Sequence, residues 1–166
     1  MWLVAKIKKR EIETFKRDLI KKSGSNTEFY CPKFEYYKYF RKKVKRLEKF
    51  ALENYIFCYH KNFGDQTFIR KLKFVKGLEY FLNGYYQNQN EIIKFIQYCK
   101  SFENNKGYLT QAFFKNMITK KAKFISGPFV NIIFEILEKQ KNKIKIIVGN
   151  VVTTISDNSK YLYRPI

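Results

Sequence analysis

The chain has 166 residues, room for one domain or two small ones, and 45% of them are hydrophobic, which excludes a disordered chain. Lys and Arg number 34 against 14 acids, so the net charge is +20. This excess favours a polyanionic partner, with nucleic acid as the default and an anionic membrane surface as a weaker choice, although high charge also serves solubility alone.

The cysteines, the single histidine and the N-terminal residues limit which metal sites and which cellular compartment we expect. Cys31, Cys58 and Cys99 form no Cys-x-x-Cys pair, and the single His60 cannot complete a zinc site. We therefore expect free thiols, no metal and no other cofactor. The opening "MWLVAKIKKR" lacks the apolar core of a signal peptide, and no run approaches about 18 apolar residues. A cytoplasmic protein with no membrane partner is expected.

The first predicted elements alternate strands with one helix. "MWLVAKI" (1–7) is a short apolar strand, and "REIETFKRDLIKK" (10–22) has its apolar residues at helical spacing. "TEFYCPKFEYYKYF" (27–40) is aromatic and β-prone, and "RKKVKR" (41–46) is typical of a basic hairpin tip or loop. "ALENYIFCYH" (51–60) predicts a second strong strand with alternating aromatics.

The next elements lead to a polar stretch. "GDQTFIRKLK" (64–73) predicts a short helix capped by Asp65, and "FVKGLEYFLNG" (74–84) predicts a strand ended by glycine. "NQNEIIKFIQYCKS" (88–101) opens on an Asn cap and shows one apolar helical stripe. "FENNKGYLTQ" (102–111) is polar and indicates a linker.

Past the linker the chain turns to short β-like segments, among them "KAKFI", "KIKIIV", "VVTTI" and "YLYRPI". "VNIIFEIL" (130–137) fits both a strand and a helix, because its apolar residues satisfy both periods. This order predicts an α+β fold: an α+β domain over 1–101 built on an antiparallel sheet, a linker over 102–116 and a small five-stranded β-barrel over 117–166.

Four segments in this order resemble the NusG/RfaH family of transcription elongation factors. They are "MWLVAKIKK", with its Trp-containing strand; "LENYIFCYH", with Asn-Tyr-Ile-Phe; "FVKGLEYFLNG", with Lys-Gly before a Phe; and "TKKAKFISGPF", at the start of the barrel. The resemblance implies an NGN domain followed by a KOW barrel. It also implies a monomeric, nucleoid-associated antitermination factor that binds the clamp helices of the largest RNA polymerase subunit and reduces pausing or termination.

The resemblance carries particular residues onto this docking role. Tyr55 and Phe57 match the family's clamp-facing aromatics, and residues two apart share one face of a strand. Ile92, Ile93 and Ile96 would border the same patch. The alternative for all five is that they are core residues, since an amphipathic helix needs a buried stripe in any case.

Basic residues near the same family motifs are expected to contact upstream DNA or the exposed non-template strand; a solvated charged face is the alternative. They are Lys8, Lys9, Arg70, Lys71, Lys73 and Lys76. A second basic group is expected to contact polymerase or DNA from the hairpin tip, with the same alternative. It consists of Arg41, Lys42, Lys43, Lys45 and Arg46.

In the barrel the resemblance assigns partner binding to Phe129 and Ile132, and a ribosomal small-subunit protein is one partner it suggests. "GNVVTTI" replaces the family's Phe-Gly-Arg turn, which disfavours the usual termination-factor partner and favours a specialised paralogue over the housekeeping factor. Phe134 stands where such barrels usually have glycine. Because glycine disfavours helix, its absence here gives the hypothesis that residues 130–141 have some tendency to form a helix. The following segment "KIKIIVGNVVTTI" is rich in β-branched residues, which disfavour a helix.

No catalytic constellation is present in the sequence: there is one His, no Gly-rich phosphate loop and only scattered acids. We therefore expect a binding protein and not an enzyme. The alternative function is a basic KOW-type RNA-binding or ribosome-associated protein, which would not need the Tyr55 and Phe57 pair.

Overall fold

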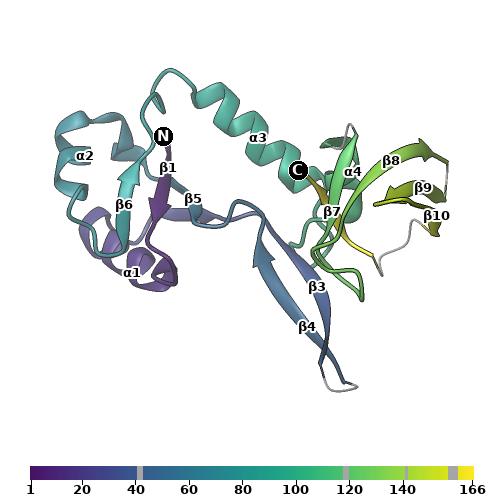
Figure 1. Ribbon diagram of the computed structural model, residues 1–166. Coiled ribbons are helices and arrows are strands. Elements are labelled where there is room, and N and C mark those ends of the chain that lie inside the picture. Colours follow the sequence, from purple (N-terminus) through teal and green to yellow (C-terminus); the bar gives the residue numbers. More distant parts are fainter. Residues whose placement is uncertain (41–42, 118–119, 141, 157–160) are drawn as a thin grey trace. The chain divides into compact units, whose positions relative to one another are not determined.

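The computed structural model describes residues 1–40, 43–117, 120–140, 142–156 and 161–166. These form an N-terminal unit, Met1–Lys33 with Phe50–Ser101, and a C-terminal unit, Phe34–Lys49 with Phe102–Ile166. Most elements of both units are labelled in Figure 1. Antiparallel sheets and helices occur together, so the predicted α+β class is confirmed.

The N-terminal unit is built on a four-stranded antiparallel sheet in the order β2-β5-β1-β6. Val4 lies opposite Phe57 in the register between the two central strands, and Ala5 lies opposite Phe81 on the other side. The elements of this unit are β1 (Trp2–Ile7), α1 (Ile12–Ser23), β2 (Glu28–Tyr30), β5 (Tyr55–Tyr59), the 3-10 helix η1 (Lys61–Gly64), α2 (Gln66–Leu72), β6 (Leu78–Phe81) and α3 (Gln89–Ser101).

The two faces of this sheet are buried differently because side chains alternate along each strand. Leu3, Ala5 and Ile7 of β1 are buried with residues of α1 and α2 in the larger core. Val4 and Phe57 are buried with Ile96 of α3 on the opposite face. Helices therefore pack on both faces of this sheet.

One local signal begins a helix as expected, and a second helix is joined to the sheet by a contact that the sequence did not predict. The Asp65 side chain accepts a hydrogen bond from the Thr67 amide at 2.8 Å, which confirms the predicted cap of α2. At the start of α3 it is Gln89 that connects to the sheet: its Oε1 accepts from the Trp2 amide at 2.9 Å, and its Nε2 donates to the Trp2 carbonyl at 2.8 Å. The sequence signals do not reveal this second link, because it joins residues 87 apart.

The C-terminal unit holds a five-stranded antiparallel sheet in the order β10-β9-β8-β7-β11 and a two-stranded sheet of β3 and β4. Among the described residues no pairing joins β10 to β11, so closure of the five strands into a barrel stays a prediction. The elements are β3 (Lys33–Phe40), β4 (Lys43–Phe50), α4 (Gln111–Met117), β7 (Lys121–Phe124), β8 (Ile133–Lys139), β9 (Lys143–Val148), β10 (Val151–Ser156) and β11 (Tyr163–Pro165).

Within the ambiguous segment at 130–137, residues 133–137 belong to strand β8 and residues 130–132 lie in the turn before it. Phe134 of β8 is 1% exposed, and its ring centroid lies 4.4 Å from that of Phe124. Tyr163 packs edge-on against the same ring at 5.6 Å. The large side chain at 134 therefore fills the core of this sheet, whereas a glycine would fill none of it. The helical leaning over 130–141 stays a hypothesis.

The structure differs from the sequence expectation between 102 and 117. Part of the predicted linker, 102–116, forms helix α4, in which Phe113 and Phe114 are both 4% exposed. Phe34 at the start of β3 packs edge-on against Phe114 with ring centroids 5.3 Å apart. This contact helps to explain why the β3–β4 hairpin groups with the C-terminal unit, although the sequence placed it in 1–101. The domain boundaries themselves stay predictions.

Candidate interaction surfaces

A shallow apolar depression lies on the α3 face of the N-terminal sheet. Its volume is about 360 Å³ and its lining is apolar except for Glu91, so neither Lys nor Arg lines it. On a chain of charge +20, a surface without a cation is suited to an apolar partner. The apolar residues that line it include Val4, Leu52, Tyr55, Phe57, Leu82 and Ile92.

Helix α3 supplies one wall of this depression because its apolar stripe faces the sheet. Phe95 lies over Phe57 with ring centroids 5.7 Å apart, and Ile96 is 4% exposed beneath the helix. The Gln89 link to β1 holds the first turn of α3 to the sheet that forms the floor.

A polar cluster lies beside Tyr55 at the edge of the same sheet face. The Lys6 ammonium lies 3.3 Å from the Glu79 carboxylate and 5.4 Å from the centre of the Tyr80 ring. The hydrogen bond to Glu79 raises the pKa of Lys6, and a hydrogen bond with Tyr80 raises the pKa of Tyr55. Tyr55 thus lines the depression next to this polar cluster.

The five predicted docking residues differ in solvent exposure and in whether they line the depression. Tyr55 and Ile92 are half-buried and line the depression, whereas Ile93 is 38% exposed and is not part of its lining. Phe57 and Ile96 are only 5% and 4% exposed, so their burial agrees with the core alternative. Their contact with a partner stays a prediction.

Sequence reasoning missed Leu52, Leu82 and Phe95, which also line the depression. Phe95 could have been found, since it belongs to the same helical stripe as Ile92. Leu52 and Leu82 lie within the predicted strand segments 51–60 and 74–84 but outside β5 and β6, so strand alternation does not place their side chains on this face.

A second surface consists of two basic loops that the fold brings together. The Lys8 amide donates to the Gly77 carbonyl at 2.9 Å, and this bond joins the segment after β1 to the segment before β6. A Cβ on Gly77, where φ is +79°, would lie 3.0 Å from the Glu11 carbonyl oxygen, so the close approach requires glycine. The basic side chains that the sequence assigned to nucleic acid are all exposed. Lys8, Lys9, Lys73 and Lys76 lie in the two loops, and Arg70 and Lys71 lie in the last turn of α2, just before the second loop.

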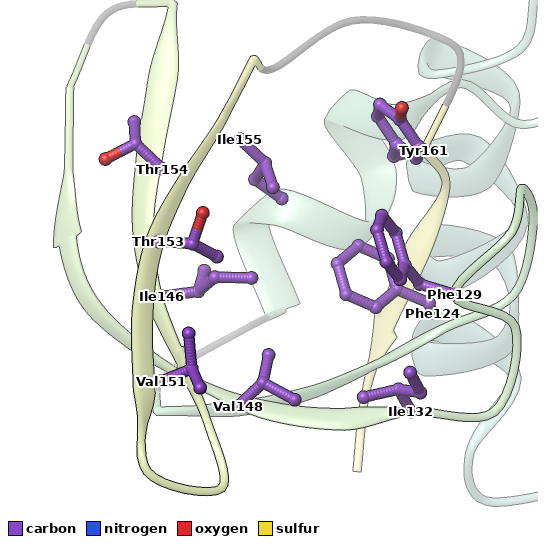
Figure 2. A pocket seen from close by; sticks show the side chains of 10 residues that line it. All are labelled: Phe124, Phe129, Ile132, Ile146, Val148, Val151, Thr153, Thr154, Ile155 and Tyr161. Atoms are coloured by element: carbon purple, nitrogen blue, oxygen red, sulfur yellow. The ribbon is translucent and has the colours of Figure 1, made fainter.

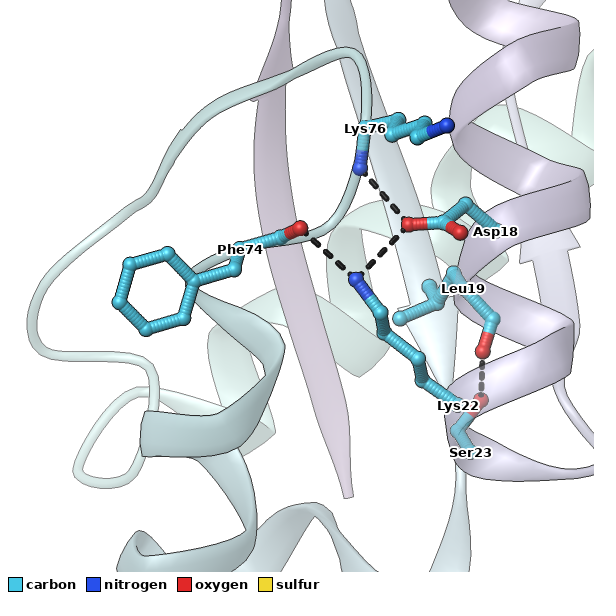
Figure 3. Close-up of polar contacts among 6 residues, drawn as sticks. All are labelled: Asp18, Leu19, Lys22, Ser23, Phe74 and Lys76. Atoms are coloured by element: carbon cyan, nitrogen blue, oxygen red, sulfur yellow. Dashed lines mark hydrogen bonds and ion pairs between the residues drawn. The ribbon is translucent and has the colours of Figure 1, made fainter.

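Asp18 of α1 fixes the second of these loops, as Figure 3 shows. Its Oδ2 accepts hydrogen bonds from the Lys76 amide at 2.8 Å and from Lys22 Nζ at 2.9 Å. Lys22 Nζ also donates to the Phe74 carbonyl at 2.7 Å. The bond from the Lys76 amide, followed by that from Lys22, lowers the pKa of Asp18. The loop is thus held by its backbone, which leaves the Lys76 side chain exposed.

Phe74 is an exposed aromatic within this basic loop that the sequence reasoning missed. Its side chain is 83% exposed, more than any other large hydrophobic residue described. Arg70, Lys71 and Lys73 precede it and Lys76 follows. Aromatic rings among cations suit stacked nucleic-acid bases, and burial of Phe74 in the core is excluded by its exposure.

The C-terminal unit has an apolar cavity of about 490 Å³ between β9, β10 and the segments beside β7 and β11 (Figure 2). The predicted partner-binding residues Phe129 and Ile132 both line it, and they are 44% and 37% exposed. The centroid of the Phe129 ring lies 5.8 Å from that of Phe124 and 6.1 Å from that of Tyr161, so Phe129 packs against two aromatic rings. A partner role for Phe129 and Ile132 stays a prediction.

The tip of the β3–β4 hairpin is only partly described. Arg41 and Lys42 lie outside the described residues, and the other three predicted tip residues, Lys43, Lys45 and Arg46, belong to strand β4 instead of a loop. Within the described residues, no three His, Cys, Asp or Glu side chains gather as a metal site requires. No helix in that part of the chain is long and apolar enough to cross a bilayer.

No protein-family profile matches the chain, and no curated protein matches it. Among solved structures, the chain is similar to the MjSpt4:Spt5 complex in its conformation B, at 9% identity and a TM-score of 0.37 over 100% of this chain and 99% of the other. It is also similar to NusG of Thermotoga maritima, at 14% identity and a TM-score of 0.37 over 99% of this chain and 96% of the other.

Proposed function

We propose that this chain is a transcription elongation factor of the NusG/RfaH kind. Its N-terminal unit docks on the clamp helices of the largest RNA polymerase subunit and reduces pausing or termination. The support is the sequence resemblance over 1–9, 52–60, 74–84 and 119–129, together with the apolar depression on the α3 face. The proposed role is binding, and it involves no catalytic residue.

The observation that carries the proposal is the cation-free depression beside Tyr55. An amphipathic helix places apolar anchors in a groove of this kind at i, i+3 and i+4 spacing, as helix-in-groove recognition requires. Tyr55 is half-buried and belongs to β5, a strand paired on both sides, so its backbone is ordered before a partner arrives. Tyrosine is one of the residue types that contribute most to binding when they are buried in an interface.

The two basic loops supply the proposed contact with nucleic acid on the same unit. Lys8, Lys9, Lys73 and Lys76 are exposed, and upstream DNA or the non-template strand is the target that the resemblance suggests. Each phosphate contact would add roughly 0.7 to 0.9 to the slope of log affinity against log salt. Phe74 adds a ring on which a base of a single strand would stack.

Retention of purified core RNA polymerase on immobilised full-length protein tests the docking proposal. Tyr55→Ala removes the aromatic ring, and Ile92→Ala removes a half-buried side chain of the opposite wall. Each is expected to weaken retention at least about tenfold, the effect of losing a hot-spot residue worth 1.4 kcal/mol or more. Tyr86→Ala is the matched control, because Tyr86 is a 58% exposed tyrosine of the same unit that does not line the depression.

The outcome depends on folding, which circular dichroism and thermal melting check. Phe57→Ala is not a suitable variant, since truncation of a buried Phe costs about 3–5 kcal/mol and would unfold the unit. If Tyr55→Ala and Ile92→Ala fold as the wild type does and retain polymerase equally well, the docking assignment is wrong.

A basic KOW-type RNA-binding or ribosome-associated protein is the second candidate, and the exposed Phe74 within its basic loop is the observation that favours it. Retention of ribosomes or RNA, unaffected by Tyr55→Ala but lost in Phe74→Ala, would decide for it. The barrel partner, for which a ribosomal small-subunit protein is proposed, would bind over Phe129 and Ile132 in either case.

A further inference from the structure

One face of the β3–β4 hairpin carries lysines. The ion pair between Glu35 and Arg46 places the odd-numbered residues of β3 on the same face as the even-numbered residues of β4. The opposite face therefore has the even-numbered residues of β3 and the odd-numbered residues of β4. Its exposed cations are Lys38, Lys43, Lys45 and Lys49.

The acids of the hairpin lie on the other face. Glu35 pairs with Arg46 there, and Glu48 accepts a hydrogen bond from the Tyr108 hydroxyl at 3.1 Å. In contrast, no ion pair or hydrogen bond engages the side chains of Lys38 and Lys49 within the described part of the chain. The lysine face thus presents positive charge that the protein itself does not neutralise.

A cleft of about 490 Å³ lies between this face and the 125–131 loop of the same unit. Lys38 and Lys49 line it from the hairpin with Tyr36, and Asn131 lines it from the loop. None of the lining residues is acidic. The cleft therefore offers two ammonium groups together with a phenol and an amide, all of which can donate hydrogen bonds.

The walls of the cleft are held by contacts within the C-terminal unit. Phe34 packs on Phe114 at the base of the hairpin, with ring centroids 5.3 Å apart. The Gly127 amide points to the Tyr37 carbonyl at 3.4 Å and connects the loop to β3. The site thus exists before any ligand is bound, which reduces the ordering that binding requires.

We propose that this lysine face and cleft bind the phosphate backbone of a nucleic acid. Lys43 and Lys45 are two residues apart on β4, about 6.6 Å along the strand, so the cations form a row and not a single point. A row of lysines flanked by tyrosine and asparagine donors suits a chain of phosphates, which such side chains contact without reading the base sequence. None of these residues belongs to the depression or to the two basic loops, so this inference does not depend on the proposed polymerase docking.

Salt-dependent binding of the full-length protein tests the inference. The probes are a DNA duplex, a DNA single strand and an RNA single strand of one sequence, titrated by fluorescence anisotropy between about 50 and 200 mM salt. For K38A/K49A, the loss of two phosphate contacts is expected to lower the slope of log affinity against log salt by about 1.8 on a duplex or about 1.4 on a single strand. The accompanying loss of affinity should be tenfold or more, and the probe that shows the change identifies the form bound.

The matched control is K61A/K106A, which removes the same charge from two exposed lysines that do not line the cleft. Its slope should stay close to that of the wild type on every probe. Equal slopes for the two double variants on all three probes would overturn the proposal. So would a K38A/K49A variant that keeps its nucleic-acid slope and loses binding only to polyglutamate, because the surface would then be one for an acidic polypeptide.

Discussion

The Gln89 side chain is the connection between α3 and the sheet that we expect to be most sensitive to mutation. It accepts a hydrogen bond from the Trp2 amide at 2.9 Å and donates to the Trp2 carbonyl at 2.8 Å and the Tyr85 carbonyl at 2.8 Å. Gln89→Ala removes all three bonds and leaves both backbone groups of Trp2 without this partner. The substitution itself favours helix, so propensity does not confound the result.

The expected magnitude follows from these three bonds. Each contributes about 1 kcal/mol net, and an unsatisfied buried group costs about 1–3 kcal/mol. The site is only partly buried, so water replaces some of what is lost, and a total of about 2–3 kcal/mol is expected. For a unit of this size, that corresponds to a fall in melting temperature on the order of 10–15 °C.

Thermal melting followed by circular dichroism measures the effect, with Gln87→Ala as the control. Gln87 is an exposed glutamine two residues earlier, in the turn before α3, and its loss should shift the melting temperature by less than about 2 °C. Gln89→Glu gives a second readout. A carboxylate still accepts from the Trp2 amide but opposes two carbonyl oxygens, so it should destabilise at pH 7 and recover partly when protonated near pH 4. A Gln89→Ala protein that melts with the Gln87→Ala control would refute the anchoring role.

Three other perturbations have expected outcomes. Gly77→Ala should lower the free energy of unfolding by about 2–3 kcal/mol in urea denaturation, because it adds a close contact with the Glu11 carbonyl to the strain of a positive φ. Gly84→Ala, where only the end of a side chain is close, should lower it by about 1 kcal/mol. Equal losses for the two variants would contradict the contact at Gly77. Burial lowers the pKa of His60 in the folded state, so the neutral imidazole stabilises the fold at pH values above the pKa of the unfolded chain. The urea midpoint of the wild type should therefore fall as the pH drops from 7.5 to 5. A His60→Gln variant with the same pH profile would contradict this role. Burial raises the pKa of Cys31 to about 11, so iodoacetamide at pH 8 should alkylate it slowly until urea unfolds the chain, and fast modification of the folded protein would contradict its burial.

Periodicity predicted most of the elements because their apolar residues repeat locally. The β1 and α1 segments have clear strand and helix periods, and Asp65 caps α2 as its position before the apolar stripe suggested. The segment around Phe134 fitted two periods, and only its pairing with β7 and β9 selects a strand. Helix α4 within the predicted linker was missed for a related reason: the burial of Phe113 and Phe114 depends on partners distant in sequence, such as Phe34 for Phe114.

For the candidate surfaces, too, the sequence predicted the residue types and the packing decided which of them are exposed. The residues assigned to the docking depression came from family motifs, yet whether each is exposed depends on how α3 lies on the sheet, which buries Phe57 and Ile96 and leaves Tyr55 at the edge. Nothing in the sequence indicated that Phe74 is exposed, because a phenylalanine in a segment rich in apolar residues is ordinarily buried in the core.

The sequence by itself determined the charge of +20, the free thiols, the α+β order of elements and the residue types available for binding. These follow from composition and from local period, which need no knowledge of distant contacts. The tertiary structure decided where a cation-free depression and a lysine-lined cleft lie, because each joins segments separated along the chain. Strand register selects which side chains share a face, and the packing of α3 and of the β3–β4 hairpin selects which of those remain accessible.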